Sequence, residues 1–194
     1  MYGTLYLIPC PISDETAPWD VLPAANRAVM DSLDYFIVEN TRSARRFLSR
    51  AGIQRPIDSL RFAELNEHST PEAVAELLTP VLAGTDAGVI SEAGLPGVAD
   101  PGADLAALAH LHGVEVVPLV GPSSILLALM ASINTVFASP SVYDEVHVSV
   151  SDAFKYITMC FFRGISTKEG IHIIDDTFRK HFPGGLFGQN KVRA

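Results

Sequence analysis

The feature that most limits what this chain can fold into is a pair of segments built in the same order. Each has a short apolar run, a loop of glycine, proline and serine, and then a helix-forming stretch. The first covers residues 88–112 with the loop SEAGLPGVADPG, and the second covers residues 114–132 with the loop GPSS. Glycine and proline shape tight turns and let backbone approach a ligand closely. Because ligands of an open α/β sheet bind at the carboxyl ends of its strands, we expect both loops to face one pocket.

The same alternation of strands and helices extends back to the start of the chain. Asp20 is placed to cap the first expected helix, Gly52 to end the second, and Thr70 before Pro71 to start the third. Regular alternation of this kind predicts an α/β fold with a mostly parallel sheet flanked by helices. The expected strands cover residues 4–9, 35–38, 88–90 and 114–119, and the expected helices cover residues 20–33, 42–51, 71–83, 104–112 and 123–131.

The character of the chain changes near residue 134. Residues 1–133 are expected to form one α/β domain, and residues 134–194 a divergent, partial or poorly ordered segment with scattered aromatic residues and weak periodicity. Alternating valines at residues 146–150 are typical of a strand, and residues 153–162 suit a strand or a helix. The sequence assigns no fold to this segment.

Composition narrows the classes of function. A net charge of −8 argues against a large non-specific nucleic-acid footprint, because phosphate binding is built from lysine and arginine, but it allows a small basic patch. The first residues lack the basic region of a secretory signal, and no window holds about 18 uninterrupted apolar residues. We therefore expect a cytoplasmic protein that does not enter a membrane. Cys10 and Cys160 are too few for a disulfide framework or a cysteine-based metal site.

Several chemistries lack their sequence signature. The GPSSI run has Ile125 where the nucleophile elbow of a serine hydrolase needs a second glycine. The chain has neither GxGxxG nor GxxxxGK[ST], with which Rossmann and P-loop proteins cradle phosphates. His110 and His112 lie off a common helix face, so we expect no metal site there. Cys10 has no evident base and is interpreted as a small buried residue.

Four segments together resemble one enzyme family. They read GTLYLIPCPI at residues 3–12, FIVENTRSARRFL at residues 36–48, VISEAGLPGVADPG at residues 89–102 and VVPLVGPSSILLALMAS at residues 116–132. In this order and spacing they resemble the tetrapyrrole methylase superfamily of S-adenosylmethionine-dependent methyltransferases. The resemblance is strongest to the branch that methylates a ribose 2′-hydroxyl in small-subunit ribosomal RNA, and it covers roughly the first two thirds of the chain.

The resemblance implies the N-terminal domain of a two-domain methylase that forms a homodimer. Its implied cofactor is S-adenosyl-L-methionine, and its implied partner is ribosomal RNA or the small ribosomal subunit. Without the family, Gly94, Pro96 and Pro101 are also explained as residues that shape a tight surface loop. The implied cofactor-binding residues are Pro9, Ser91, Glu92, Ala93, Gly94, Pro96, Val98, Asp100, Pro101, Ser123 and Ser124.

The residues after the second expected strand form the candidate acceptor side. Glu39 follows that strand, where a carboxylate can orient or deprotonate an attacking hydroxyl, or else cap the next helix. We assign Glu39 and Arg42 as catalytic. The arginines at positions 42, 45, 46 and 50 share one helical face, which suits RNA phosphates or simply solvent. The expected substrate-binding residues are Asn40, Thr41, Arg45, Arg46 and His68, of which His68 also has a purely structural interpretation.

Two departures from the family pattern bear on activity. The chain has Asn40 where the family usually has aspartate, and after Ser132 it lacks the expected Gly-rich stretch and second α/β domain. These departures are typical of a truncated, divergent or frame-shifted member. The predicted activity is methyl transfer from S-adenosylmethionine to a ribose 2′-hydroxyl of small-subunit ribosomal RNA. A tetrapyrrole-methylating enzyme and a non-catalytic remnant of the fold are the alternatives.

Overall fold

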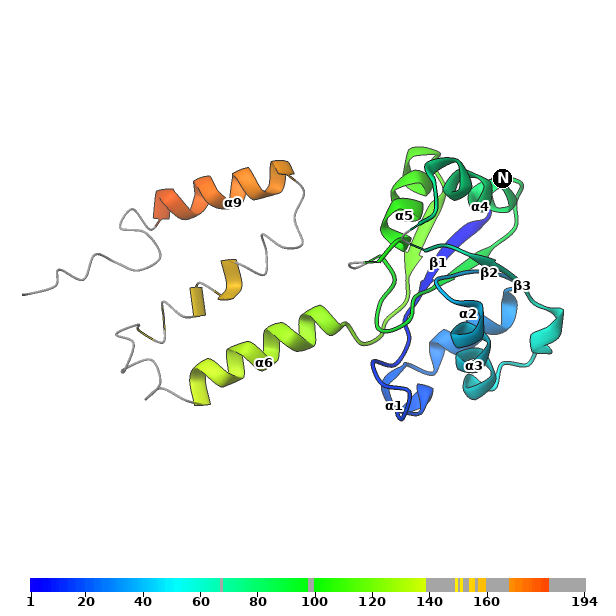
Figure 1. Cartoon of the computed structure of the whole chain (residues 1–194), viewed down its shortest axis with the longest axis horizontal. Helices are drawn as coiled ribbons and strands as arrows, with labels where there is room; N and C mark the ends of the chain where they lie inside the picture. The colour runs from blue at the N-terminus through cyan, green and yellow to red at the C-terminus, as the bar shows by residue number, and fades with distance from the viewer. Residues whose placement is uncertain are drawn as a thin grey trace, which may run out of the picture. The chain divides into compact units, whose positions relative to one another are not determined.

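The computed structural model divides the chain into two compact units, Met1–Ser124 and Ile125–Ala194, and each is described by itself (Figure 1). The domain boundary predicted after residue 133 falls inside a helix, α6 (Ser124–Ala138), and stays a prediction. The structure describes residues 1–66, 68–97, 100–138, 149, 151, 154–155, 157–159 and 168–181.

The first unit is built on a five-stranded sheet in which every pair of neighbours is parallel. The spatial order is β3-β2-β4-β1-β5. All four residues of β2 and of β4 are buried, as expected for parallel strands covered on both faces. The predicted α/β fold with a parallel sheet is therefore confirmed. The strands are β1 (Thr4–Ile8), β2 (Tyr35–Val38), β3 (Arg61–Glu64), β4 (Ala87–Ile90) and β5 (Glu115–Pro118).

Helices cover both faces of this sheet (Figure 1). α1 (Pro18–Val21), α2 (Ala25–Ser32) and α3 (Thr41–Ala51) pack one hydrophobic cluster against the first face. α4 (Pro71–Leu82) and α5 (Gly102–Leu111) pack a second cluster against the opposite face. The first unit therefore has three layers, and its strand ends are framed by helix starts.

The single helix predicted over residues 20–33 is wrong. The chain forms α1 and α2 instead, because Pro23 has no N–H to donate and disfavours helical backbone at the residue before it. Leu22 accordingly has extended torsions of φ −102° and ψ 136°. Asp20 lies within α1 and does not cap it; the N-cap position is Ala17, which makes no side-chain capping bond.

The segment between α3 and α4 holds two elements that were not predicted from the sequence. A 3-10 turn, η1 (Ile57–Ser59), leads into β3, which pairs with β2 at the edge of the sheet. The β3 sequence RFAE has an exposed residue at each end and no alternation of apolar and polar residues. Its strand conformation follows from pairing with the buried β2, which local sequence does not reveal.

The described part of the second unit includes α6 and α9 (Lys168–His181). α6 extends to Ala138, beyond the end predicted at residue 131. The elements considered for residues 146–150 and 153–162 lie mostly outside the described residues. None of the helices in the described residues is both long enough and apolar enough to cross a membrane.

Candidate functional site

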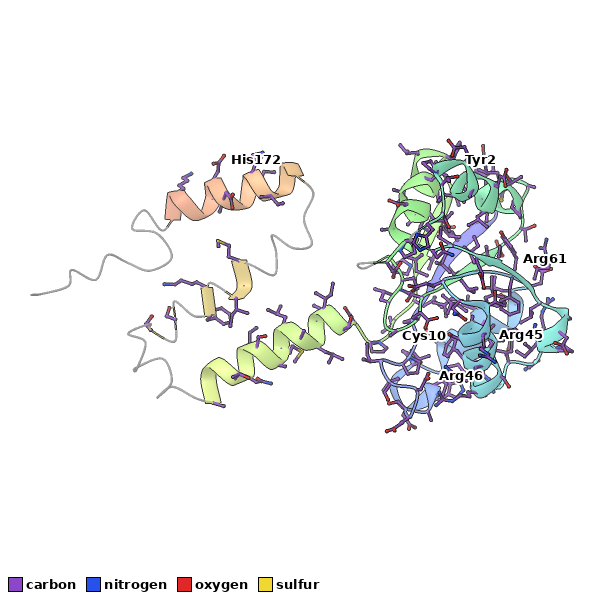
Figure 2. All side chains as sticks on the ribbon, in the orientation of Figure 1. Tyr2, Cys10, Arg45, Arg46, Arg61 and His172 are labelled. Atoms are coloured by element: carbon purple, nitrogen blue, oxygen red, sulfur yellow. The ribbon has the colours of Figure 1, made fainter. Side chains whose placement is uncertain are left out.

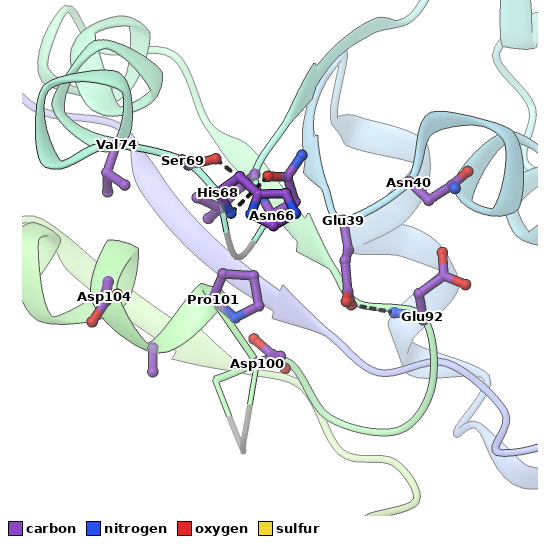
Figure 3. Close-up of a pocket in the computed structure, with 12 residues that line it drawn as sticks. Glu39, Asn40, Asn66, His68, Ser69, Val74, Glu92, Asp100, Pro101 and Asp104 are labelled. Atoms are coloured by element: carbon purple, nitrogen blue, oxygen red, sulfur yellow. Dashed lines mark hydrogen bonds between the residues drawn. The ribbon is translucent and has the colours of Figure 1, made fainter.

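A pocket of about 760 Å³ opens at the carboxyl ends of the strands. The neighbours β2 and β4 continue in opposite directions, since β2 leads through α3 outward to β3 and β4 leads through α5 across to β5. Such a switch in direction leaves a crevice where open α/β sheets bind ligands. The lining comes from the loops after β2, β3 and β4 and from the first turns of α4 and α5 (Figure 3): Glu39, Asn40, Leu65, Asn66, His68, Ser69, Val74, Glu92, Asp100, Pro101, Ala103 and Asp104.

Glu39 is fixed at the wall of this pocket. Its backbone N–H donates to the Ile90 carbonyl at 3.2 Å, which continues the pairing of β2 with β4 by one residue. Its Oε2 accepts a hydrogen bond from the backbone N–H of Glu92 at 3.1 Å (Figure 3). Both bonds tie the residue to the strand and loop across the switch point.

Asn40, and not Glu39, caps α3. Its Oδ1 accepts from the N–H groups of Arg42 at 2.9 Å and Ser43 at 3.2 Å. The capping interpretation considered for Glu39 is therefore wrong. Asparagine and aspartate are nearly equal as N-caps, so the exchange of Asp for Asn at this position keeps the local fold.

Thr41 joins the start of α3 to the end of the edge strand. Its backbone N–H donates to Oε1 of Glu64 at 3.1 Å. Hydrogen bonds from the Thr41 side chain and backbone hold the pKa of the exposed Glu64 carboxyl below its ordinary value. The segment 39–41 is thus bonded at three successive residues, each to a different partner.

The residues predicted to bind the cofactor meet at two places. Cys10 and Gly94 form an isolated antiparallel bridge, with N–H···O distances of 2.8 and 3.2 Å. A Cβ built on Gly94 lies 3.5 Å from the backbone N of Ser124, and one built on Gly121 would overlap the Pro9 ring. The structure thus brings Pro9, Gly94 and Ser124 together where the loops after β1, β4 and β5 converge.

The rest of the loop after β4 borders the switch-point pocket. Glu92, Asp100 and Pro101 line it, and Ser91 is buried beside them. Asp100 also closes the loop, because its carboxylate accepts from the N–H of Gly97 at 3.0 Å and from that of Gly102 at 2.7 Å. Val98 lies outside the described residues.

Three of the four arginine side chains of α3 bond within the first unit. Arg45 pairs with Asp58, and its guanidinium lies over the Phe62 ring at 5.7 Å from the ring centre. Arg46 pairs with Asp14 at 2.9 Å. Figure 2 shows Arg45 and Arg46 on the part of the first unit that carries α3. Arg50 donates to the Thr16 carbonyl at 2.8 Å. The guanidinium of Arg42 makes no hydrogen bond or ion pair with any described residue.

Cys10 is unsuited to nucleophilic chemistry. Burial, with smaller contributions from the negative charges of Glu92 and Asp14, raises the pKa of its thiol from 9.0 to about 12. The thiol therefore stays protonated near neutral pH. Its interpretation as a small buried residue is confirmed.

Sequence reasoning missed part of the pocket lining. Only His68 was singled out from the loop after β3, yet Leu65, Asn66 and Ser69 line the pocket as well. Asn66 shapes this loop, since its Oδ1 accepts from the His68 N–H at 3.0 Å and its own N–H donates to Ser69 Oγ at 3.0 Å. An asparagine two residues before His68 is a turn signal, but without β3 the loop had no strand to follow.

The first unit belongs to the class of doubly covered parallel α/β proteins with a pocket at the topological switch point. No protein-family model matches the chain. Three relatives are named ribosomal RNA small subunit methyltransferase I. The protein of Mesorhizobium japonicum is 38% identical to this chain over 128 residues. That of Neisseria meningitidis serogroup B is 36% identical over 127 residues, and that of Xylella fastidiosa is 30% identical over 130 residues.

This similarity confirms the resemblance expected from the four sequence segments, since about two thirds of the chain is similar to small-subunit ribosomal RNA methyltransferases of the tetrapyrrole methylase family. The match takes in 66%, 66% and 67% of this chain, in the same order of relatives. The chain spans only 40%, 40% and 44% of the length of those relatives.

Proposed function

We propose that this chain takes part in transfer of a methyl group from S-adenosylmethionine to a ribose 2′-hydroxyl of small-subunit ribosomal RNA. One observation supports the proposal above the others. The carboxylate of Glu39 and the glycine-rich loop after β4 form adjoining walls of one pocket, in a region similar to proteins named ribosomal RNA methyltransferases. The same proposal includes a cytoplasmic location and a homodimer.

The residues present fit S-adenosylmethionine. The pocket volume of about 760 Å³ falls within the range of small-molecule sites. Four carboxylates line it, those of Glu39, Glu92, Asp100 and Asp104, and they suit the positive sulfonium and ammonium groups of this cofactor. When bound, the cofactor supplies an electrophilic methyl group. We propose that residues 91–97, Asp100 and Pro101 hold it, with Pro9, Ser123 and Ser124 at the adjoining convergence of loops.

The acceptor side consists of this chain's own groups. An in-line displacement mainly requires that the attacking oxygen be aligned, and its proton must also be removed. Glu39 is proposed to accept that proton, because one carboxylate oxygen is held by the Glu92 N–H and the group faces the pocket. Asn40, Thr41 and His68 are proposed to contact the nucleotide. Arg42, on the first turn of α3, is proposed to bind a neighbouring phosphate.

The two alternatives have less support. The four carboxylates of the pocket would repel the carboxylates of a tetrapyrrole precursor and the phosphates of RNA alike, so charge at the pocket does not separate these two substrates. The names of the relatives, which refer to ribosomal RNA, favour the RNA substrate. A non-catalytic remnant would share the fold and lack cofactor affinity.

Calorimetric titration with S-adenosylhomocysteine, the product that occupies the cofactor site without turning over, tests the proposal first. We expect saturable one-site binding at micromolar strength. The same protein is then given the cofactor and small ribosomal subunits that lack ribose methylation, and incorporated methyl is mapped. A folded sample that takes up no ligand favours the remnant, and methylation of a tetrapyrrole but not of RNA favours the other enzyme.

A further inference from the structure

Positive charge is confined to one part of the first unit. The first unit contains seven arginines and no lysine, and the first and last of these arginines are Arg27 and Arg61. Residues 62–124, which include α4, β4, α5 and β5, contain acidic side chains but no lysine or arginine. In a chain of net charge −8, the side formed by α2, α3 and the edge strand β3 is thus where this unit can attract an anion.

Two arginines on α3 are already paired with carboxylates that flank the helix. Asp14 comes from the loop between β1 and α1 and pairs with Arg46, while Asp58 comes from η1 and pairs with Arg45. The side chains of Asp14 and Asp58 are 76% and 91% exposed, and those of the two arginines are 56% and 40% exposed. Exposed pairs of this kind are weak and are screened by salt, so an external anion can replace the carboxylate.

A third arginine lies next to the pocket and has no carboxylate partner among the described residues. Arg42 stands two residues after Asn40, which lines the pocket and caps α3. Its guanidinium bonds to no described residue, whereas Arg45 and Arg46, one turn further along the helix, are paired. Guanidinium groups match the geometry of phosphate oxygens, and their spacing on one helical face suits successive phosphates of a strand.

We propose that the outer face of α3 is a docking surface for an RNA backbone, on which phosphates replace Asp14 and Asp58 as the partners of Arg46 and Arg45. Arg42 makes the first contact, and the strand then runs along α3 with its start at the pocket rim. The acidic side carrying α4 and α5 repels RNA, so the surface also sets the direction of approach. This inference rests on the proposed function only for the identity of the polyanion.

The exchange has a measurable consequence. Each phosphate that pairs with an arginine releases a condensed counterion, so RNA binding weakens as salt rises. The exposed arginine–aspartate pair that must first be broken is itself weakened by salt, which offsets part of this dependence. Binding by the native protein is therefore weaker, and less dependent on salt, than its arginines alone would give. Removing the two aspartate charges takes away the competitor and leaves the arginines in place.

The test compares native protein with the double variant Asp14→Asn, Asp58→Asn. The probe is a fluorescein-labelled single-stranded RNA oligonucleotide, followed by anisotropy without cofactor from about 50 to about 200 mM salt. We expect the double variant to bind about tenfold more tightly at low salt. Its slope of log affinity against log salt should be steeper by at most about 1.4, since each of the two phosphate contacts contributes about 0.7. Each single variant should give about half the effect, which keeps the test usable if the double variant unfolds.

The matched control is Glu76→Gln, Glu115→Gln, which changes net charge equally at two exposed carboxylates on α4 and β5. Equal gains in the test and control variants would overturn the proposal, because net charge alone would then explain them. Absence of RNA binding by the native protein and the variants would overturn it too. Since the assay contains no cofactor and follows no methylation, its outcome is separate from the test of methyl transfer.

Discussion

The carboxylate of Glu39 accepts a hydrogen bond from the backbone amide of Glu92, with 3.1 Å between Oε2 and N. The bond joins the loop after β2 to the loop after β4, across the point where these neighbouring strands continue in opposite directions. Because the donor is a backbone group, the Glu92 side chain is not needed for it. Glu39 is thereby held at the pocket wall, and the task of capping α3 falls to Asn40.

Replacing Glu39 with glutamine separates the charge of this residue from its position. The glutamine carbonyl can still accept from the Glu92 N–H, so the loop and the affinity for S-adenosylhomocysteine should stay as they are. Methyl transfer should fall by about 10²- to 10⁴-fold, the usual contribution of a general base. Single-turnover transfer and calorimetry measure the two properties. Unchanged turnover would remove the proposed role of Glu39.

Gly94→Ala tests the convergence of loops, with Gly113→Ala as a matched control. Both glycines have φ of +74°, so alanine should destabilise the fold by about 1 kcal/mol at either position. A Cβ at Gly113 meets nothing within 4 Å, whereas at Gly94 it lies 3.2 Å from Ile12 Cδ1 and 3.5 Å from the Pro122 carbonyl oxygen. We expect only Gly94→Ala to weaken S-adenosylhomocysteine binding. Equal affinities of the two variants would place the cofactor away from this loop.

Much of the first unit was predictable because its signals are local. The apolar run of β2 was predicted with its observed bounds, Gly52 ends α3 with a φ of +62°, and Thr70 caps α4 with its hydroxyl. Glu39 and the loop after β4 were each predicted to follow a strand of the sheet, and both line the pocket. The loop after β5 was expected to face the same pocket, but none of its residues is among those that line it, and it meets the loop after β4 at Gly94 instead.

Apart from the helix interrupted at Pro23, the features that were missed are those whose conformation depends on neighbouring elements. β3 is a strand because it pairs with β2, and its own residues RFAE carry no strand pattern. Without β3, the loop that brings Asn66 and Ser69 into the pocket had no place in the fold. The arginine face of α3 was predicted from helical spacing, but the carboxylates of Asp14 and Asp58 that meet it come from other elements.

Asn40 variants test whether the departure from the family's aspartate affects folding. Asn40→Asp keeps an oxygen acceptor for Arg42 N–H and Ser43 N–H and adds a charge at the positive end of α3, so stability should be equal or slightly higher. Asn40→Ala should cost about 1 kcal/mol of unfolding free energy. Urea unfolding measures both changes. An alanine variant as stable as the native protein would show that the cap contributes little.

Substitution of Arg42, Arg45 and Arg46 together by alanine should weaken RNA binding and flatten its dependence on salt, because three phosphate contacts are lost. Arg27→Ala is the control, because the guanidinium of Arg27 contacts the Trp19 ring and backbone carbonyls at the end of α3 and is not one of the proposed phosphate contacts. Anisotropy over a range of salt concentrations measures both variants. If the native and triple-substituted proteins bound RNA with equal affinity, the arginine face would be a solvent-exposed surface that takes no part in RNA binding.

The buried thiol of Cys10 predicts a pH dependence of stability at alkaline pH. Its pKa is raised by burial from 9.0 to about 12, so between these values the unfolded chain loses a proton that the folded chain keeps. The unfolded state then binds fewer protons, and the free energy of unfolding falls as pH rises, by at most about 1.4 kcal/mol per pH unit. The contribution is fully present below pH 9 and is lost as pH rises toward 12.

Cys10→Ala removes this titration while leaving every other ionisable group in place. The variant should be less stable at neutral pH, because a buried side chain has been shortened, but its stability should fall less steeply than that of the native protein above about pH 9. Urea unfolding at several pH values from 8 to about 10.5 gives the two curves. Their difference should narrow as pH rises, and parallel curves would mean that the thiol ionises as readily in the folded chain as in the unfolded one.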